Sequence, residues 1–203
     1  MENRKQVITA METYAKEHQV PIIDTESLRF LVDFFAKNQV TSILEIGSAI
    51  GYSAIQFADQ LGAKVVTVER DEQRFELAQQ NVLQAGLEDQ IELHLHDALE
   101  WDFAAAYPQA QFDALFIDAA KGKNLQMFEK FAPYAKKIII TDNVLYHGLV
   151  ETTDHIRNRR TRQMIQKIRT YNEWVLNNPE FDSYLERIGD GLIITLRKDE
   201  NHV

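Results

Sequence analysis

The sequence predicts an α/β fold built on a seven-stranded, mostly parallel sheet, with helices on both faces and an antiparallel hairpin at the C-terminal end. Three observations lead to this prediction. Residues 42–53 read as an apolar strand that enters a glycine turn and then opens a helix. Apolar runs and helical segments alternate after that turn, as they do in parallel sheets. Near the end of the chain, Asp190-Gly191 separates two strand patterns, which is typical of a hairpin.

The expected elements follow from hydrophobic spacing and from capping residues. Strands are expected at residues 42–46, 64–69, 91–96, 112–118, 137–143, 181–188 and 192–196. Helices are expected at residues 3–18, 24–38, 51–60, 72–84 and 161–177. We expect one domain over residues 1–203, in which residues 1–38 form a helical cover and residues 39–203 form a Rossmann-like core.

The composition limits the classes of protein and of metal site. There is no cysteine, so any metal must be held by oxygen or imidazole ligands. The N-terminus has no apolar leader and no run is long enough to span a membrane, so we expect a cytoplasmic protein without a membrane partner. The net charge of -9 argues against non-specific coating of nucleic acid, although it allows a local basic patch.

The glycine turn predicts a nucleotide-cofactor cradle. Gly47 and Gly51 have no side chain that would keep a bound molecule away from the backbone. Ala49 stands where a dinucleotide-binding turn needs its middle glycine. Glu45, just before the turn, would repel phosphates but suits the ammonium and sulfonium groups of S-adenosylmethionine. The alternative is an ordinary joint between a strand and a helix.

Two further acids follow the next strands. Glu69 ends the second strand, 22 residues after Gly47, where an acid is placed to bind both hydroxyls of a ribose. Asp97 follows the third strand, where it would meet an adenine amino group. His94 and His96 share one face of that strand, and we interpret them as a surface face because no third metal ligand lies nearby.

Polar side chains also end the fourth and fifth strands. These are Asp118, Asp142 and Asn143. Ligands of open α/β sheets bind at the carboxyl ends of the strands, so we expect these three to converge. Two carboxylates and one amide suit Mg²⁺ or another hard divalent cation. The alternative is that they are helix caps that follow strands.

Five motifs together resemble the metal-dependent O-methyltransferases of the catechol and caffeoyl-CoA type, in order and over nearly the whole chain. They are Val20-Pro21-Ile22-Ile23, Ile43-Leu44-Glu45-Ile46-Gly47 with Gly51-Tyr52-Ser53, Asp118-Ala119-Ala120-Lys121, Thr141-Asp142-Asn143-Val144-Leu145 and Gly189-Asp190-Gly191-Leu192. The resemblance implies a class I S-adenosylmethionine-dependent methyltransferase fold and a homodimer.

The same resemblance implies roles for single residues. Glu45, Gly47 and Ser53 would bind the methionine end of the cofactor, Glu69 its ribose, and Asp97 with Ala98 its adenine. Ile23 would lie near the cofactor, although apolar packing explains it equally well. Asp118 would serve both metal and cofactor, with Asp142 and Asn143 completing the metal site. Lys121 and Asp118 would be the catalytic residues.

One basic stretch does not look like the members that act on small molecules. Six positive charges fall within residues 157–169, and four of them, Arg157, Arg159, Arg160 and Arg162, come first. They read either as a solvated helix start or as a phosphate clamp. As a clamp, they resemble the bacterial tRNA 5-hydroxyuridine O-methyltransferases, which act at the wobble position of the anticodon stem-loop.

The favoured function is therefore Mg²⁺-dependent O-methylation of 5-hydroxyuridine in tRNA, giving 5-methoxyuridine. A small catechol-like or phenolic acceptor is the alternative. A cofactor-binding protein without turnover is a further alternative, but such a protein needs neither the metal ligands nor Lys121. An NAD-dependent dehydrogenase fits least well because the middle glycine of the turn is missing.

Overall fold

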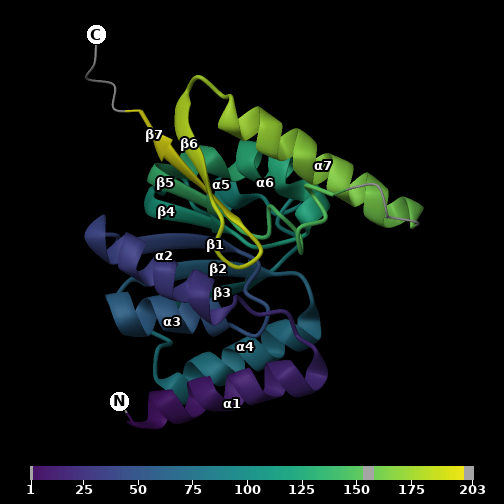
Figure 1. The fold of residues 1–203 in the computed structure, drawn as a ribbon. Helices are drawn as coiled ribbons and strands as arrows, with labels where there is room; N and C mark the ends of the chain where they lie inside the picture. The colour runs from purple at the N-terminus through teal and green to yellow at the C-terminus, as the bar shows by residue number, and fades with distance from the viewer. Residues whose placement is uncertain (1, 153–157, 199–203) are drawn as a thin grey trace. The chain divides into compact units, whose positions relative to one another are not determined.

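The computed structural model describes residues 2–152 and 158–198, and its contacts separate the chain into two compact units (Figure 1). The first unit, residues 1–109, contains α1 (Glu2–His18), α2 (Thr25–Lys37), β1 (Ser42–Ile46), α3 (Tyr52–Leu61), β2 (Lys64–Glu69), α4 (Glu72–Ala85), β3 (Ile91–Leu95) and α5 (Phe103–Ala106). The second unit, residues 110–203, contains β4 (Phe112–Ile117), η1 (Lys121–Lys123), α6 (Asn124–Phe131), η2 (Ala132–Tyr134), β5 (Ala135–Thr141), α7 (Arg159–Leu176), β6 (Phe181–Glu186) and β7 (Leu192–Arg197).

The strands pair as the sequence predicts. In the first unit the order is β3-β2-β1 and both pairings are parallel. In the second unit the order is β4-β5-β7-β6, with β4 parallel to β5 and with β7 antiparallel to both β5 and β6. The described residues thus contain seven strands, three parallel pairings and the predicted C-terminal hairpin. Buried apolar side chains fill most of β1, β4 and β5, as expected for strands covered on both faces.

The N-terminal helices are anchored to the first unit by polar contacts. Arg4 on α1 donates from Nε to the carbonyl of Ala85 at 2.8 Å and from Nη2 to that of Gly86 at 3.2 Å. These carbonyls end α4, where backbone acceptors lack partners within the helix. Figure 1 shows α1 lying alongside α4. From the sequence, either Asp24 or Thr25 could cap α2; the structure shows that Asp24 does so, by accepting from two backbone amides.

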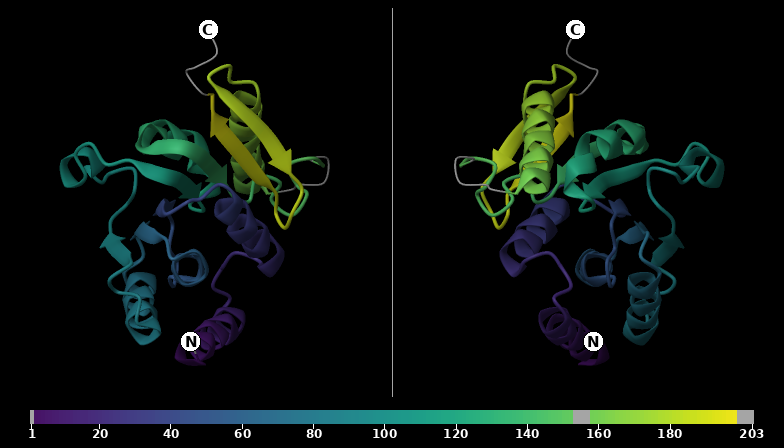
Figure 2. Two further views of the ribbon diagram at one scale, coloured as in Figure 1. Left: turned by 90° about the vertical axis from the view of Figure 1, so that its left-hand side faces the viewer. Right: turned by 90° about the vertical axis from the view of Figure 1, so that its right-hand side faces the viewer.

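The long helix of the second unit fixes the end of β5. Figure 2 shows α7 alongside the hairpin of β6 and β7 in both views. Ile165, Ile168, Tyr171 and Val175 form its buried face. The Tyr171 hydroxyl lies 2.6 Å from Thr141 Oγ1, and burial raises the pKa of this tyrosine. Because Thr141 is the last residue of β5, this contact positions the polar residues that follow it.

Several boundaries differ from the predictions. β5 ends at Thr141 rather than at residue 143, so Asp142 and Asn143 lie in the loop after the strand. α7 begins at Arg159, two residues earlier than expected, because Asn158 accepts from the amides of Arg160 and Thr161. The sequence analysis did not predict α6, a short helix with no side-chain cap at its start. Across residues 2–152 and 158–198, no helix is long and apolar enough to cross a lipid bilayer.

A hydrogen bond from Tyr52 to Glu12 joins α1 to the start of α3. Tyr52 is 3% exposed and its hydroxyl donates to Glu12 Oε1 at 2.6 Å. Burial first, and then the bond to Glu12, raise the pKa of Tyr52 from 10.0 to about 12. The folded protein therefore keeps a proton that the unfolded chain releases at lower pH.

We predict that Tyr52→Phe lowers the free energy of unfolding by about 1 kcal/mol, the usual net value of one hydrogen bond. Because the folded-state pKa of Tyr52 is raised from 10.0 to about 12, its contribution is complete below pH 10 and is lost as the pH rises through 12. Urea unfolding from pH 8 to 11 measures this, with Tyr14→Phe as the control. Equal pH dependence in wild type and Tyr52→Phe would contradict the prediction.

Candidate functional site

The glycine turn after β1 has the left-handed backbone that a tight loop requires. Gly47 has φ 104°, Ala49 has φ 46° and Gly51 has φ 85°. Glycine adopts this region freely, whereas alanine does so at a cost of about 1–2 kcal/mol. The surroundings must therefore hold Ala49 in place. Glu69 supplies one such contact, because its Oε2 accepts from the Ala49 amide at 2.9 Å.

Gly51 is also required by the packing of α4. A Cβ atom at this position would lie 3.3 Å from Ala78 Cβ, which is tighter than ordinary contact. Part of the reason for a glycine here is thus helix packing, which the sequence analysis did not consider. Gly51 precedes α3, and no side chain caps that helix start. Its first amides remain available to a carboxylate such as that of a methionine group.

Glu45 is buried and bonded to two hydroxyls. Its side chain on β1 is 0% exposed. It accepts from Ser53 Oγ on α3 and from Thr67 Oγ1 on β2, both at 2.5 Å. The parallel register sets Glu45 directly opposite Thr67. The carboxylate thereby ties three elements together and aims the hydroxyl of Ser53. The predicted contact between Glu45 and the cofactor stays a prediction.

Glu69 links the glycine turn to the turn that follows β2. It is 8% exposed. Besides the Ala49 amide, it accepts from the amides of Arg70 and Asp71 at 2.8 and 2.9 Å, both on Oε1. A carboxylate oxygen accepts about two hydrogen bonds, so Oε2 retains the capacity to accept one more. A ribose hydroxyl is the predicted donor.

The remaining predicted cofactor residues lie in the same unit. Asp97 follows β3, where its Oδ1 accepts from the Leu99 amide at 2.9 Å and its side chain is 37% exposed. Arg70 Nη1 lies 3.9 Å from the other carboxylate oxygen of Asp97. Ala98 and Ile23 are both buried. Their predicted contacts with adenine and with the cofactor remain untested.

His94 and His96 belong to an aromatic cluster. The His94 ring lies 4.7 Å from the Trp101 ring, and His96 stacks on the same indole at 5.2 Å. His94 Nε2 is 2.6 Å from the Tyr107 hydroxyl, and burial lowers the pKa of His94. His96 is exposed, and His94 is partly exposed, with its ring against Trp101 and Tyr107.

The predicted metal ligands are brought together in the second unit. Asn143 Nδ2 donates to Asp118 Oδ1 at 2.9 Å, and the Asn143 amide donates to Asp142 Oδ1 at 2.6 Å. Asn143 has φ 62°, a conformation that asparagine tolerates better than most residues. The backbone amide of Asp142 donates to the carbonyl of Ile117 at 3.0 Å, which continues the ladder between β4 and β5. The sequence-based expectation that these residues converge is confirmed.

These donors fit a hard cation. The Asn143 side-chain nitrogen faces Asp118 and its backbone amide faces Asp142, whereas its side-chain oxygen accepts from Lys121. Carboxylate and amide oxygens are ligands that Mg²⁺ accepts. Within residues 2–152 and 158–198 no group of three or more His, Cys, Asp or Glu side chains forms a metal cluster. The predicted metal site has two acids and one asparagine, so it would not count as a group of three such side chains. Metal binding by Asp118, Asp142 and Asn143 stays a prediction.

Lys121 lies against the same residues. Its Nζ donates to Asn143 Oδ1 at 2.6 Å and lies 5.0 Å from the centroid of the Tyr146 ring. The ammonium thus sits between an amide oxygen and an aromatic face, both of which attract positive charge. Sequence reasoning missed Tyr146. Tyr146 directly follows the fifth-strand motif, but nothing in that motif predicts its contact with Lys121.

The basic segment lies at the start of α7. Arg157 lies outside the described residues. Arg159, Arg160 and Arg162 are exposed on the first turn of the helix, and no carboxylate of the described residues forms an ion pair with them. The positive end of a helix dipole disfavours cations by about 0.3–1 kcal/mol each. Three arginines at this end are more readily explained by an anionic partner than by helix stability.

The structure changes which basic residues lie exposed near the start of α7. Arg169 is structural, because its Nε donates to the carbonyl of Val150 at 2.6 Å. η1 packs against α7, where a Cβ atom on Gly122 would lie 3.5 Å from Lys167 Cδ. Lys167 is exposed, and so is Lys123 on η1. Sequence reasoning missed Lys123 because it lies 36 residues before Arg159 in the chain.

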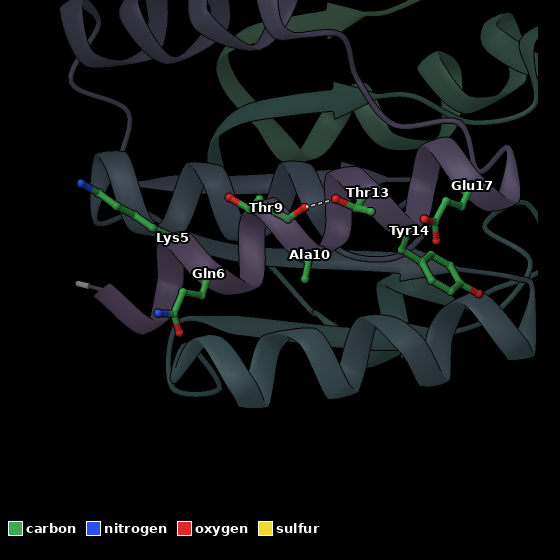
Figure 3. A pocket seen from close by; sticks show the side chains of 7 residues that line it. All are labelled: Lys5, Gln6, Thr9, Ala10, Thr13, Tyr14 and Glu17. Carbon is green, nitrogen blue, oxygen red and sulfur yellow. Dashed lines mark hydrogen bonds between the residues drawn. The ribbon is translucent and has the colours of Figure 1, made fainter.

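Figure 3 shows a surface hollow of about 630 Å³ that contains none of the predicted residues. Its seven lining residues all belong to α1 and include Lys5, Thr13 and Glu17. The dashed line in the figure is the bond from Thr13 Oγ1 to the Thr9 carbonyl at 3.0 Å, which is internal to the helix. We assign this hollow no catalytic role.

Comparison with known proteins relates these sites to a family. An O-methyltransferase family profile matches residues 2–198. The catechol O-methyltransferase of Mycobacterium tuberculosis is 30% identical over 70% of this chain and 68% of its own length. The chain belongs to the O-methyltransferase family.

Solved structures agree with this assignment. A protein from Staphylococcus aureus, assigned as a caffeoyl-CoA O-methyltransferase, is 35% identical, with a TM-score of 0.89 and coverage of 98% of this chain and 100% of that one. The O-methyltransferase from Bacillus cereus, in complex with SAH, is 26% identical, with a TM-score of 0.81 and coverage of 95% and 91%.

This methyltransferase is therefore an S-adenosylmethionine-dependent O-methyltransferase of the catechol and caffeoyl-CoA type. The predicted family, class I fold and methyl-donating cofactor are confirmed. The roles of single residues, the metal, the acceptor and the homodimer stay predictions.

We predict that Glu69→Ala weakens S-adenosylmethionine binding at least ten-fold. The change removes the carboxylate predicted to bind the ribose and also the contact that holds Ala49, and one hydrogen bond to a charged group contributes about 1.5–3 kcal/mol. Calorimetry measures the affinity. Glu76→Ala is the matched control, because Glu76 is an exposed acid on α4. Unchanged affinity in Glu69→Ala would show that Glu69 does not bind the cofactor.

Proposed function

We propose that this protein transfers the methyl group of S-adenosylmethionine to the 5-hydroxyl of 5-hydroxyuridine in the anticodon stem-loop of tRNA, with Mg²⁺ as cofactor. The observation that carries the proposal is the row of exposed arginines at the start of α7, in the same unit as Lys121 and the predicted metal ligands. A tRNA acceptor also implies a cytoplasmic protein. The family resemblance extends the proposal to a homodimer, which sedimentation analysis of the purified protein tests.

The metal would be held by Asp118, Asp142 and Asn143. When bound, it supplies a Lewis acid that lowers the pKa of an acceptor hydroxyl. The uridine offers two adjacent oxygens, its 5-hydroxyl and its 4-carbonyl, which match a cation that has open positions left by only three protein ligands. A catechol offers a similar pair, so the metal alone does not select the acceptor.

Lys121 is the proposed catalytic residue. Its ammonium is already bonded to Asn143 Oδ1 and faces the Tyr146 ring. Near a developing oxyanion it would act as a positive partner, or in its neutral form as the base that takes the hydroxyl proton. In the transfer, the new bond joins the acceptor oxygen to the methyl carbon while the carbon–sulfur bond breaks. The carbon–sulfur electron pair stays on sulfur, which leaves as S-adenosylhomocysteine. The hydroxyl proton goes to Lys121 if the lysine is the base, or to water if Lys121 is the positive partner.

In this proposal, the cofactor residues of the first unit bind S-adenosylmethionine and orient it. The Ser53 hydroxyl is fixed by the buried Glu45, and the Ala49 amide is fixed by Glu69. Neither contact needs to form during binding, so less conformational entropy is lost when the cofactor enters. A protein that only binds S-adenosylmethionine would need this cradle but not the polar cluster around Lys121. That cluster favours catalysis over simple binding.

We predict that the metal is catalytic rather than structural. Exhaustive chelation with EDTA, or Asp142→Ala, should abolish methyl transfer while circular dichroism shows an unchanged fold. Asp113→Ala is the control, because Asp113 lies near the other end of β4 and pairs with Lys136 at 3.4 Å. Full activity in Asp142→Ala or in chelated enzyme would show that the cation takes no part in the reaction.

The arginines predict a salt-dependent reaction with tRNA. Each neutralised phosphate changes the slope of log affinity against log salt by about 0.7–0.9. Replacing Arg159 and Arg160 by alanine should therefore flatten the slope by about 1.5 and raise KM for tRNA. The pair Arg29→Ala with Lys37→Ala is the control, because it removes two exposed charges from α2. Equal slopes in the double mutant and the control would show that Arg159 and Arg160 do not bind tRNA phosphates.

A small catechol-like or phenolic acceptor is the second candidate. The catechol O-methyltransferase relatives favour it by their names. Under this candidate, the enzyme methylates a free catechol at a rate that does not depend on salt or on Arg159 and Arg160. Rapid methylation of a catechol, with no transfer to hypomodified tRNA, would make this the function.

A further inference from the structure

The turn between β6 and β7 contacts the loop that carries Asn143. Gly189-Asp190-Gly191 forms this turn, and no role in the proposed chemistry accounts for it. The amide of Leu145 donates to the Asp190 carbonyl at 2.8 Å, and the amide of Val144 donates to the Gly191 carbonyl at 3.1 Å. The turn therefore acts as a short backbone partner for the residues directly after Asn143.

The Asp190 side chain extends this contact by two residues. Its Oδ1 accepts from the backbone amide of His147 at 3.3 Å and lies 2.9 Å from His147 Nδ1. Because a carboxylate only accepts, the proton must be on Nδ1. One carboxylate oxygen thus holds both the backbone and the imidazole of the same residue.

Gly191 allows the close approach. It has φ 83°, and a Cβ atom there would lie 2.5 Å from Leu145 Cγ and 3.0 Å from Leu145 Cβ. Any other residue would therefore force the Leu145 side chain to move. The glycine is explained by this contact as well as by the hairpin turn.

The loop that contacts Asp190 has an unusual backbone. Asn143 has φ 62°, Tyr146 has φ 45° and His147 has φ 53°. Such conformations are uncommon outside glycine and persist only where the surroundings determine them. Two of these residues contact Lys121, Asn143 through its amide oxygen and Tyr146 through its ring. The strained loop is therefore the element that sets the surroundings of the proposed catalytic lysine.

Other contacts hold the loop at its ends. Asn172 Nδ2 donates to the Val144 carbonyl at 2.9 Å, and Val150 packs with Ile165 and Ile168 of α7. The Tyr146 carbonyl accepts from the Leu149 amide at 3.0 Å, and the Tyr146 side chain packs against the same apolar cluster. Asp190 adds a side-chain bond to the backbone at His147.

We propose that Asp190 is a positioning residue that holds the loop from Asn143 to His147 in its left-handed conformation, so that the Asn143 amide and the Tyr146 ring face Lys121. The effect of Asp190 on catalysis rests on the proposed function. The contact between Asp190 and His147 does not, because it belongs to the fold of the second unit. Asp190 contacts the backbone of Leu145 and both the backbone and the imidazole of His147. It acts through the loop.

The first test measures the loop directly. In Asp190→Ala we expect amide hydrogen exchange over residues 143–150 to become about two- to ten-fold faster, as the loss of single hydrogen bonds implies. Asp190→Asn retains an acceptor for the His147 amide and should lie between Asp190→Ala and wild type. It also serves if Asp190→Ala fails to fold. Asp182→Asn is the matched control, because Asp182 lies on β6 of the same hairpin and pairs with Lys198 at 3.6 Å. Unchanged exchange in both Asp190 variants overturns the proposal.

The second test measures the consequence for the site. Calorimetry with Mn²⁺ should show about ten-fold weaker binding in Asp190→Ala, the usual effect of losing an outer contact to a ligand. The value of kcat should fall while S-adenosylmethionine affinity stays unchanged. A merely structural role would lower Tm and leave the Mn²⁺ affinity and kcat of the folded fraction unaltered, and that result overturns the positioning role. If wild type itself binds no Mn²⁺, the proposed metal function fails. The exchange experiment still tests whether Asp190 holds the loop.

Discussion

A carboxylate removed from water must be compensated, and this constraint shapes both predicted sites. An uncompensated buried charge costs several kcal/mol, so each acid at a strand end needs donors close by. Glu45 takes two hydroxyls and Glu69 takes three backbone amides. In the second unit, Asn143 and the backbone supply donors to Asp118 and Asp142.

These compensating bonds are also what positions the sites. The hydroxyl of Ser53 and the amide of Ala49 are held by the hydrogen bonds that they donate to Glu45 and Glu69. In the second unit, Lys121 is fixed by the amide that bridges it to Asp118. Both sites are therefore built in advance of their ligands, which reduces the conformational entropy lost on binding.

The sequence predicted what depends on regular backbone and missed what depends on loops. Glu69 ends β2 as predicted, whereas Asp118 and Asp142 directly follow β4 and β5 rather than end them. The partner of Glu45 was missed, although the parallel register puts Thr67 opposite it. Tyr146 and the contact from Asp190 to His147 could not be predicted, because they depend on left-handed φ angles at non-glycine residues, which leave no pattern in the sequence. Arg169 was counted with the exposed charges because spacing alone does not reveal its bond to the Val150 carbonyl.

We propose that the basic start of α7 fits this O-methyltransferase to a nucleic-acid acceptor. Mass spectrometry of tRNA nucleosides, from a strain of the source organism that lacks the gene, tests that claim most directly. The account predicts that 5-methoxyuridine disappears and that 5-hydroxyuridine accumulates in its place, with both restored by the wild-type gene. An unchanged amount of 5-methoxyuridine in the deletion strain would contradict it.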